Sequence, residues 1–119
     1  MKKKSYFNNE HYKNQIPKND SEIQKFGLDS NFKWMNDPRQ YFISLARYKF
    51  VSKILKGRKD VLEVGCADGF NSRLVKQSVK NLTISDAEFI FKMYNDKIKS
   101  KKWKTNFVIN DFVKSKLKK

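Results

Sequence analysis

Two glycines four positions apart, Gly65 and Gly69, form the part of this sequence best suited to hold a ligand. They follow a short apolar run that contains one acid, Glu63, in the stretch "VLEVGCADGF" (61–70). Glycine lacks a Cβ atom and tolerates positive φ, so a glycine loop after a strand lets the backbone approach a ligand closely. We therefore predict that residues 65–69 form a binding loop.

Acidic residues end two further apolar runs and suit the recognition of a ribose. Asp86 closes "NLTISD" and Asp111 closes "TNFVIND". In a parallel sheet, ligands bind beyond the carboxyl ends of the strands, where these acids and Glu63 would be neighbours. Asp86 lies 21 residues past Gly65. That spacing is close to the value of about 20 at which an acid accepts hydrogen bonds from ribose hydroxyls.

The loop composition favours a nucleoside that carries no pyrophosphate. A dinucleotide fold needs G-x-G-x-x-G, but here residues 65–70 read GCADGF, with an acid inside the loop and phenylalanine in place of the last glycine. The acid would repel pyrophosphate, and no G-x-x-x-x-G-K-[ST] phosphate loop is present. We expect an adenosine-containing cofactor without phosphate and with an ammonium group to satisfy. Asp68 itself has two interpretations, a cap of the following helix or a cofactor contact.

The elements around the loop predict an α/β fold, a partial Rossmann-like doubly wound parallel sheet with a preceding N-terminal helix. From residue 60 onward the order is strand, helix, strand, helix, strand, which predicts a parallel sheet with strand order 3-2-1. The expected strands are 60–66, 81–86 and 105–111. The expected helices are one directly after the glycine loop and one over 87–103.

The preceding helix is the best-defined element of the sequence. Asp37 can cap it, Pro38 suits its first position, and Gly57 can end it. Apolar residues recur at intervals of three and four between these signals. Before it, residues 1–30 are polar and lack a sustained period, so we expect a partly disordered arm there and a single domain over 31–119.

Composition narrows the function classes. The net charge of +15 invites a nucleic-acid or anionic-membrane partner, but the excess is mostly lysine spread along the chain, so a solvated basic surface is favoured. The single cysteine, Cys66, and the single histidine, His11, exclude a disulfide framework or a Cys/His zinc site within one chain. Cys66 is expected to be a small loop residue rather than a nucleophile. No apolar run suits a membrane span or a signal peptide, so we expect a cytoplasmic protein.

The stretch "VLEVGCADGFNSRLV" (61–75) resembles motif I of class I S-adenosylmethionine-dependent methyltransferases, usually written E/D-x-G-x-G-x-G. Asp86 and Asp111 match the next two acidic positions of that family, and Ala67 stands where the family has its middle glycine. The stretch "WMNDPRQYFISLARYKF" (34–50) is similar to the lead-in helix of bacterial members associated with glycan or small-metabolite modification.

The resemblance implies a methyltransferase, or its cofactor-binding portion, with S-adenosylmethionine as cofactor and a small molecule or glycan as acceptor. It implies that Glu63 braces the loop, that the glycines let the backbone approach the methionine part, and that Asp86 holds the ribose hydroxyls. Asp111, with Phe112 beside it, would frame the adenine. No catalytic residue is nominated. The expected cofactor-binding residues are Glu63, Gly65, Cys66, Ala67, Asp68, Gly69, Asp86, Ala87, Asp111 and Phe112.

The resemblance also implies that the chain carries the N-terminal half of the domain and stops after its third strand. The expected first strand would then be an apolar sheet edge, which a second chain or a second copy could cover. Two alternatives stay open beside the methyltransferase. One is a non-catalytic remnant or partner subunit that keeps the cofactor fold, and the other is a basic nucleic-acid-binding protein.

Overall fold

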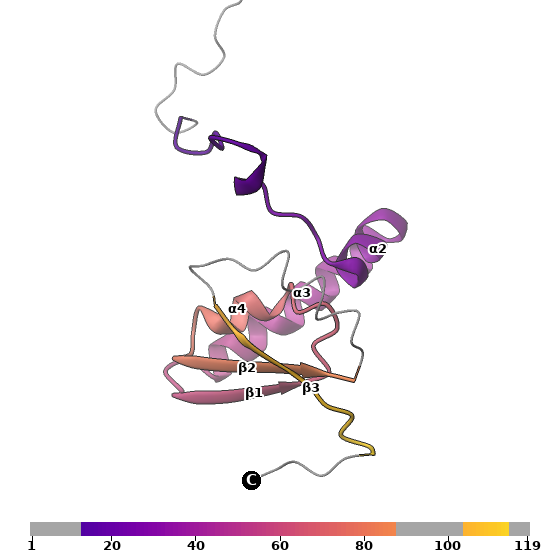
Figure 1. Ribbon diagram of the computed structural model, residues 1–119, viewed down its shortest axis with the longest axis vertical. Coiled ribbons are helices and arrows are strands. Elements are labelled where there is room, and N and C mark those ends of the chain that lie inside the picture. The colour runs from indigo at the N-terminus through magenta and orange to yellow at the C-terminus, as the bar shows by residue number, and fades with distance from the viewer. Residues whose placement is uncertain (1–12, 88–103, 115–119) are drawn as a thin grey trace, which may run out of the picture.

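The chain folds as an α/β unit around a three-stranded, all-parallel sheet, as the sequence predicts. The computed structural model describes residues 13–87 and 104–114. The strands are β1 (Asp60–Val64), β2 (Asn81–Asp86) and β3 (Asn106–Ile109), in the order β1-β2-β3, and their arrows run the same way (Figure 1). The carboxyl ends of all three strands therefore lie at one edge of the sheet.

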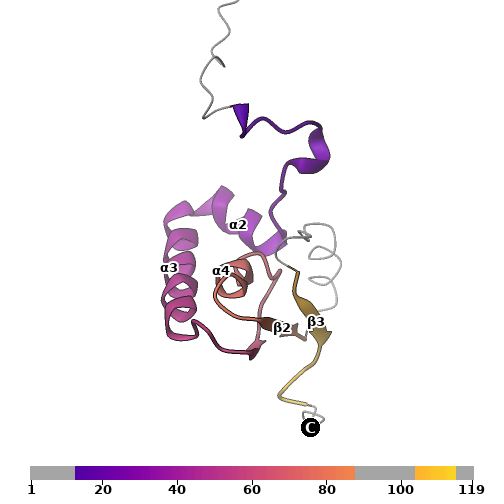
Figure 2. The ribbon, with the colours of Figure 1, turned by 90° about the vertical axis from the view of Figure 1, so that its left-hand side faces the viewer.

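Helices α3 (Pro38–Ile54) and α4 (Ser72–Lys76) lie on the same side of the sheet (Figure 2). Helix α2 (Leu28–Asn36) precedes them and packs against α3. A single 3-10 turn, η1 (Asp20–Glu22), lies in the segment before α2, which extends away from the body in Figure 1. Because α2 begins at Leu28, ordered packing starts inside the stretch that its polar composition assigns to an arm.

Helix α3 begins as the sequence predicts, with Pro38 at its first position, where its missing N–H costs nothing. The predicted side-chain cap is wrong: the Asp37 carboxylate makes no cap hydrogen bond and instead lies 3.6 Å from Nε of Arg39. The helix ends at Ile54. Gly57 follows at φ +82°, and its N–H donates to the carbonyl of Ser78 at 2.9 Å, which joins the α3–β1 turn to the α4–β2 turn.

The helix expected after the glycine loop is short, because α4 ends at Lys76 and the chain then turns into β2. Val79 lies in the turn after α4 and is still buried in the core. The apolar residue at this position therefore reflects burial, and it does not extend the helix as its spacing predicts. The third predicted helix, over 87–103, lies outside the described residues except for Ala87, which forms a bend.

The core lies between the sheet and α4. Leu82 and Ile84 of β2 are fully buried there, each worth about 1.5–3 kcal/mol in apolar burial. Val61 of β1 and Phe107 of β3 pack against the same cluster. No helix in the part of the chain that the structure describes has both the length and the apolar composition needed to cross a lipid bilayer.

Candidate functional site

The loop after β1 has positive φ at every second position. Gly65 lies at +79°, Ala67 at +52° and Gly69 at +73°. Ala67 is the non-glycine residue of this set, and a side chain there is strained. A Cβ atom added at Gly65 would meet nothing within 4 Å, so open space adjoins the start of the loop. The backbone is thus accessible at the point where a ligand would approach it.

Backbone hydrogen bonds attach this loop to the end of β2. The N–H groups of Gly65 and Cys66 both donate to the carbonyl of Ser85, at 2.8 and 2.9 Å. The N–H of Ala67 donates to Oδ2 of Asp86 at 2.8 Å. The glycine loop and the acid at the end of β2, which the sequence analysis predicts as separate signals, therefore lie in direct contact. Ala87 follows them and is exposed.

Asp68 is buried and holds two backbone segments. Its Oδ2 accepts from the N–H of Ser30 at 2.8 Å, and its Oδ1 accepts from the N–H of Phe70 at 2.9 Å. Ser30 lies in the first turn of α2, where backbone N–H groups lack intrahelical acceptors and favour an anion. Asp68 therefore caps α2, the helix far upstream in the sequence, and not the helix that follows it.

The segment that leads into α2 packs closely on the loop. A Cβ atom at Gly27 would lie 2.5 Å from Cγ of Asp68, so only glycine fits there. The ring of Phe26 meets the ring of Phe70 edge to face, with centroids 5.1 Å apart. Phe70, which replaces the last glycine of a dinucleotide motif, thus anchors this segment. Neither contact is predicted from the sequence, and the isolated glycine at 27 in a polar stretch is the signal that could have indicated them.

Glu63 lies on the helix side of β1, among hydroxyl donors. The Tyr48 hydroxyl of α3 donates to Oε1, and the Ser72 hydroxyl of α4 donates to Oε2 at 2.5 Å. Burial raises the pKa of Glu63, while these two hydrogen bonds lower it. Burial, followed by the charge of Glu63, also raises the pKa of Tyr48. Glu63 therefore connects β1 to both helices. These two hydroxyl partners are not predicted from the sequence.

Cys66 is buried in the core beside the loop. Burial, with a smaller contribution from the charge of Glu63, raises the pKa of its thiol to about 12. The thiol is neutral at physiological pH, and a thiol is a poor nucleophile unless it ionises. The arrangement at Cys66 suits packing, not covalent chemistry.

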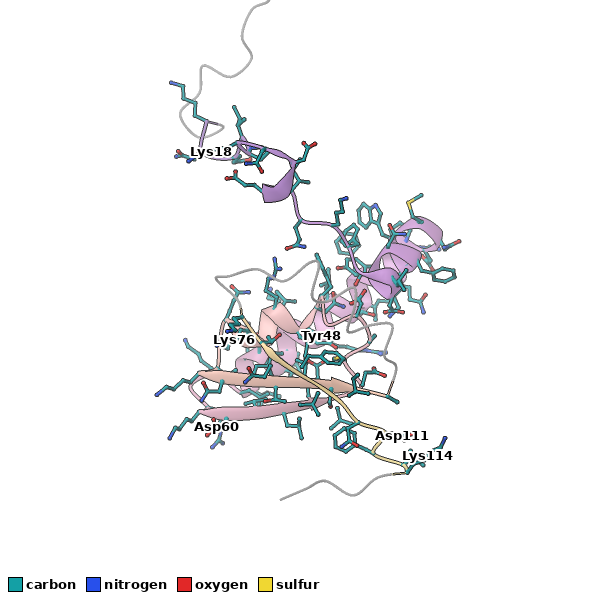
Figure 3. The ribbon with its side chains drawn as sticks, viewed as in Figure 1. Lys18, Tyr48, Asp60, Lys76, Asp111 and Lys114 are labelled. Carbon is teal, nitrogen blue, oxygen red and sulfur yellow. The ribbon has the colours of Figure 1, made fainter. Side chains whose placement is uncertain are left out.

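Asp111 lies just beyond the carboxyl end of β3, two residues after Ile109. Its Oδ1 accepts from the N–H of Val113 at 3.0 Å, and its Oδ2 lies 3.9 Å from Nζ of Lys114. The acid thus shapes the turn after β3 and is half-buried, as is Phe112. Figure 3 shows Asp111 and Lys114 near one end of the sheet and Asp60 at the other.

The site brings together a glycine loop and Asp86 at the carboxyl edge of the sheet, with Asp111 after the neighbouring strand. Within residues 13–87 and 104–114, no three His, Cys, Asp or Glu side chains gather in a way that could hold a metal ion. This geometry can bind a polar ligand with hydroxyl donors. Comparison with known proteins adds no relative, since no family model and no curated protein sequence matches the chain significantly.

Proposed function

We propose that this chain binds S-adenosylmethionine at the loop after β1, as a class I methyltransferase or as the cofactor-binding portion of one. The observation that carries the proposal is the 2.8 Å hydrogen bond from the Ala67 N–H to Asp86, which couples the glycine loop to the acid that would hold the ribose. A carboxylate at the end of a parallel strand is the kind of acceptor that ribose hydroxyls bind in nucleoside-binding folds. S-adenosylmethionine would supply an activated methyl group for a small-molecule or glycan acceptor.

Several of the candidate residues have distinct parts in this proposal. Asp86 accepts from the ribose hydroxyls, and the open backbone at Gly65 faces the methionine part. Glu63 braces the loop through Ser72, and Asp111 with Phe112 lies after β3 at the edge where adenine would sit. Asp68 supports the loop from behind and does not contribute a ligand contact, because its carboxylate is committed to α2.

Isothermal titration of the chain with S-adenosylmethionine and with its demethylated product tests the proposal. Asp86→Asn keeps an acceptor for Ala67 but removes the charge, so we expect binding to weaken about tenfold or more. Asp60→Asn is the matched control, because Asp60 lies at the opposite end of the sheet and bonds Asn81 instead. Titration with NAD should give no heat. A folded chain that binds neither ligand at high micromolar concentration contradicts the proposal.

A second candidate function, polyanion binding, has an observation of its own. The α3–β1 and α4–β2 turns are hydrogen-bonded to each other, through Gly57 with Ser78 at 2.9 Å and through Lys80 with Arg58 at 3.1 Å. Cations are clustered on these turns at the amino end of the sheet, away from the glycine loop. The exposed ones are Lys56, Arg58, Lys59 and Lys80.

This cluster predicts salt-dependent binding of a short single-stranded RNA or a DNA duplex, measured by fluorescence anisotropy. The variant Lys56→Glu with Arg58→Glu should weaken binding and reduce the slope of log affinity against log salt by about 2. Lys18→Glu with Lys25→Glu makes the same charge change in the segment before α2 and serves as control. Equal losses of affinity in both double variants would mean that the nucleic acid is attracted by the overall positive charge and not by this cluster.

A further inference from the structure

Strand β1 has an outward backbone edge on the side away from β2, where no strand pairs with it in residues 13–87 and 104–114 (Figure 1). The carbonyl of Lys59 accepts from the N–H of Asn81, and the N–H of Gly65 donates to the carbonyl of Ser85, both at 2.8 Å. Odd-numbered residues of β1 therefore direct their backbone groups toward β2. Alternate residues of a strand direct theirs the opposite way. The outward set is Asp60, Leu62 and Val64.

An apolar pocket of about 250 Å³ opens beside this edge, between α3, β1 and α4. The pocket is lined by Val51 of α3, by Leu55 just after that helix, and by Val61 and Leu62 of β1. Arg47 contributes a cation. A cavity of about 150 Å³ is enough to hold a benzene ring, so this pocket has room for a large apolar side chain.

Helix α3 continues the apolar surface away from the pocket. Ile43, Phe50 and Ile54 recur at intervals of seven and four, on the flank of α3 that also carries Arg47 and Val51. The three are 56%, 65% and 60% exposed. Isolated exposed apolar side chains are ordinary, but a stripe of them beside an outward strand edge marks a protein-binding surface.

The charge of the chain indicates which kind of protein would bind this surface. The chain carries a net charge of +15, which opposes association of two copies and favours an acidic partner. Among the described residues, Arg47 forms no ion pair, so it can meet an incoming carboxylate. An extended segment that alternates apolar and acidic side chains fits this surface. Its apolar side chains match the pocket, and its carboxylates match Arg47.

We propose that the β1 edge, the pocket and the α3 stripe form one docking surface for an extended segment of an acidic partner protein. The segment adds to the sheet as a fourth strand beside β1, places an apolar side chain in the pocket and brings a carboxylate to Arg47. Main-chain hydrogen bonds to Asp60, Leu62 and Val64 provide affinity, while the pocket and the cation provide selectivity. This docking does not depend on the cofactor proposal.

A short synthetic peptide that alternates valine and glutamate, with one phenylalanine, is the probe. We expect titration to show binding that weakens as salt rises, and no binding of the same peptide with lysine in place of glutamate. Amide hydrogen exchange reports the site directly. Exchange at Leu62 and Val64 should slow about tenfold or more on binding, while Val61 and Glu63, whose backbone groups face β2, should change little.

Two substitutions, each with a matched control, test the proposal so that it does not depend on a single variant. Leu62→Pro removes an outward N–H, which an edge strand tolerates, and should weaken peptide binding about tenfold. Ile109→Pro is its control on β3, where the Asn110 N–H bonds to Asp86 and residue 109 therefore faces outward. Arg47→Glu should also weaken binding, whereas Lys49→Glu, on the other flank of α3, should not.

Three results would overturn the proposal. The first is a peptide that fails to bind or that binds equally well to Leu62→Pro and Arg47→Glu. The second is slow amide exchange at Leu62 in the chain alone, which would mean that a segment of the same chain already covers the edge. The third is a dimer in sedimentation experiments that Leu62→Pro dissociates, which would make a second copy the occupant.

Discussion

The backbone N–H of Ala67 donates to Oδ2 of Asp86 at 2.8 Å, so the apex of the loop after β1 is held by the acid that ends β2. Nineteen residues separate the two in sequence. The contact orients a partly exposed carboxylate at the carboxyl edge of a parallel sheet, where ligands bind in folds of this kind. It also holds Ala67 in a backbone conformation that alanine adopts at a cost.

Opposite stability changes are expected at Gly65 and Ala67. Both have positive φ, a region that costs a residue with a Cβ atom about 1–2 kcal/mol, partly offset by the larger unfolded-state entropy of glycine. Ala67→Gly should therefore stabilise the chain by about 0.5–1 kcal/mol, and Gly65→Ala should destabilise it by about 1 kcal/mol. Urea unfolding measures both. A Gly65→Ala chain as stable as the parent would contradict the backbone assignment.

Asp68→Ala should be strongly destabilising, although Asp68 is an ordinary loop acid by sequence. The substitution leaves the buried N–H of Ser30 without its acceptor, at about 1–3 kcal/mol, and the partly buried N–H of Phe70 loses its acceptor at a smaller cost. Asp37→Ala should change stability by less than about 0.5 kcal/mol, since Asp37 makes no cap hydrogen bond and its ion pair is exposed. Thermal unfolding of the two variants gives the comparison. Equal losses would disprove the capping role of Asp68.

Glu63 should give the chain a stability that decreases as pH rises. Burial raises the pKa of its carboxyl above the ordinary 4.5, so the folded state binds this proton more tightly than the unfolded state does. The stabilisation is complete below pH 4.5 and is lost as pH rises through the folded pKa. Glu63→Gln removes this dependence. Urea unfolding from pH 4 upward should show a shallower decline in the variant than in the parent.

Tyr48→Phe provides an independent check on the same carboxyl group. The Tyr48 hydroxyl donates to Glu63 and thereby lowers its pKa, so its removal should raise that pKa further. The pH-dependent decline in stability should then extend to higher pH. Direct titration of the Glu63 carboxyl by carbon-detected NMR measures the shift, and an unchanged or lower pKa would argue against the hydrogen bond.

The native Cys66 thiol should resist alkylation. With a pKa of about 12, only roughly one thiol in ten thousand is ionised at pH 8, and the side chain is also buried. Iodoacetamide should label the folded chain far more slowly than the urea-unfolded chain, in which the thiol is exposed. Rapid labelling without unfolding would show instead that Cys66 is accessible and ionised.

Short-range signals were sufficient to predict most of the elements. The start of α3 follows from Pro38, whose ring disfavours any earlier helical turn. Strand β2 matches its predicted bounds, because the short apolar stretch in "NLTISD" lies between the polar residues Asn81 and Asp86. The parallel order β1-β2-β3 agrees with the alternation of strands and helices that the sequence predicts, since crossover connections allow few other arrangements.

The hydrogen-bond partners of the site residues are decided by the tertiary structure. They lie far apart in the sequence, and no sequence pattern links the residue types at the two positions. Asp68 and Ser30 are 38 residues apart, and Tyr48 and Glu63 are 15 apart. An acid can find a backbone N–H or a hydroxyl at many places, and sequence spacing does not select one. The packing of α2 and α3 against the loop and β1 selects these donors, since burial makes an unsatisfied carboxylate too costly to keep. Local residue types therefore specify the loop and its acids, and tertiary packing specifies what each acid holds.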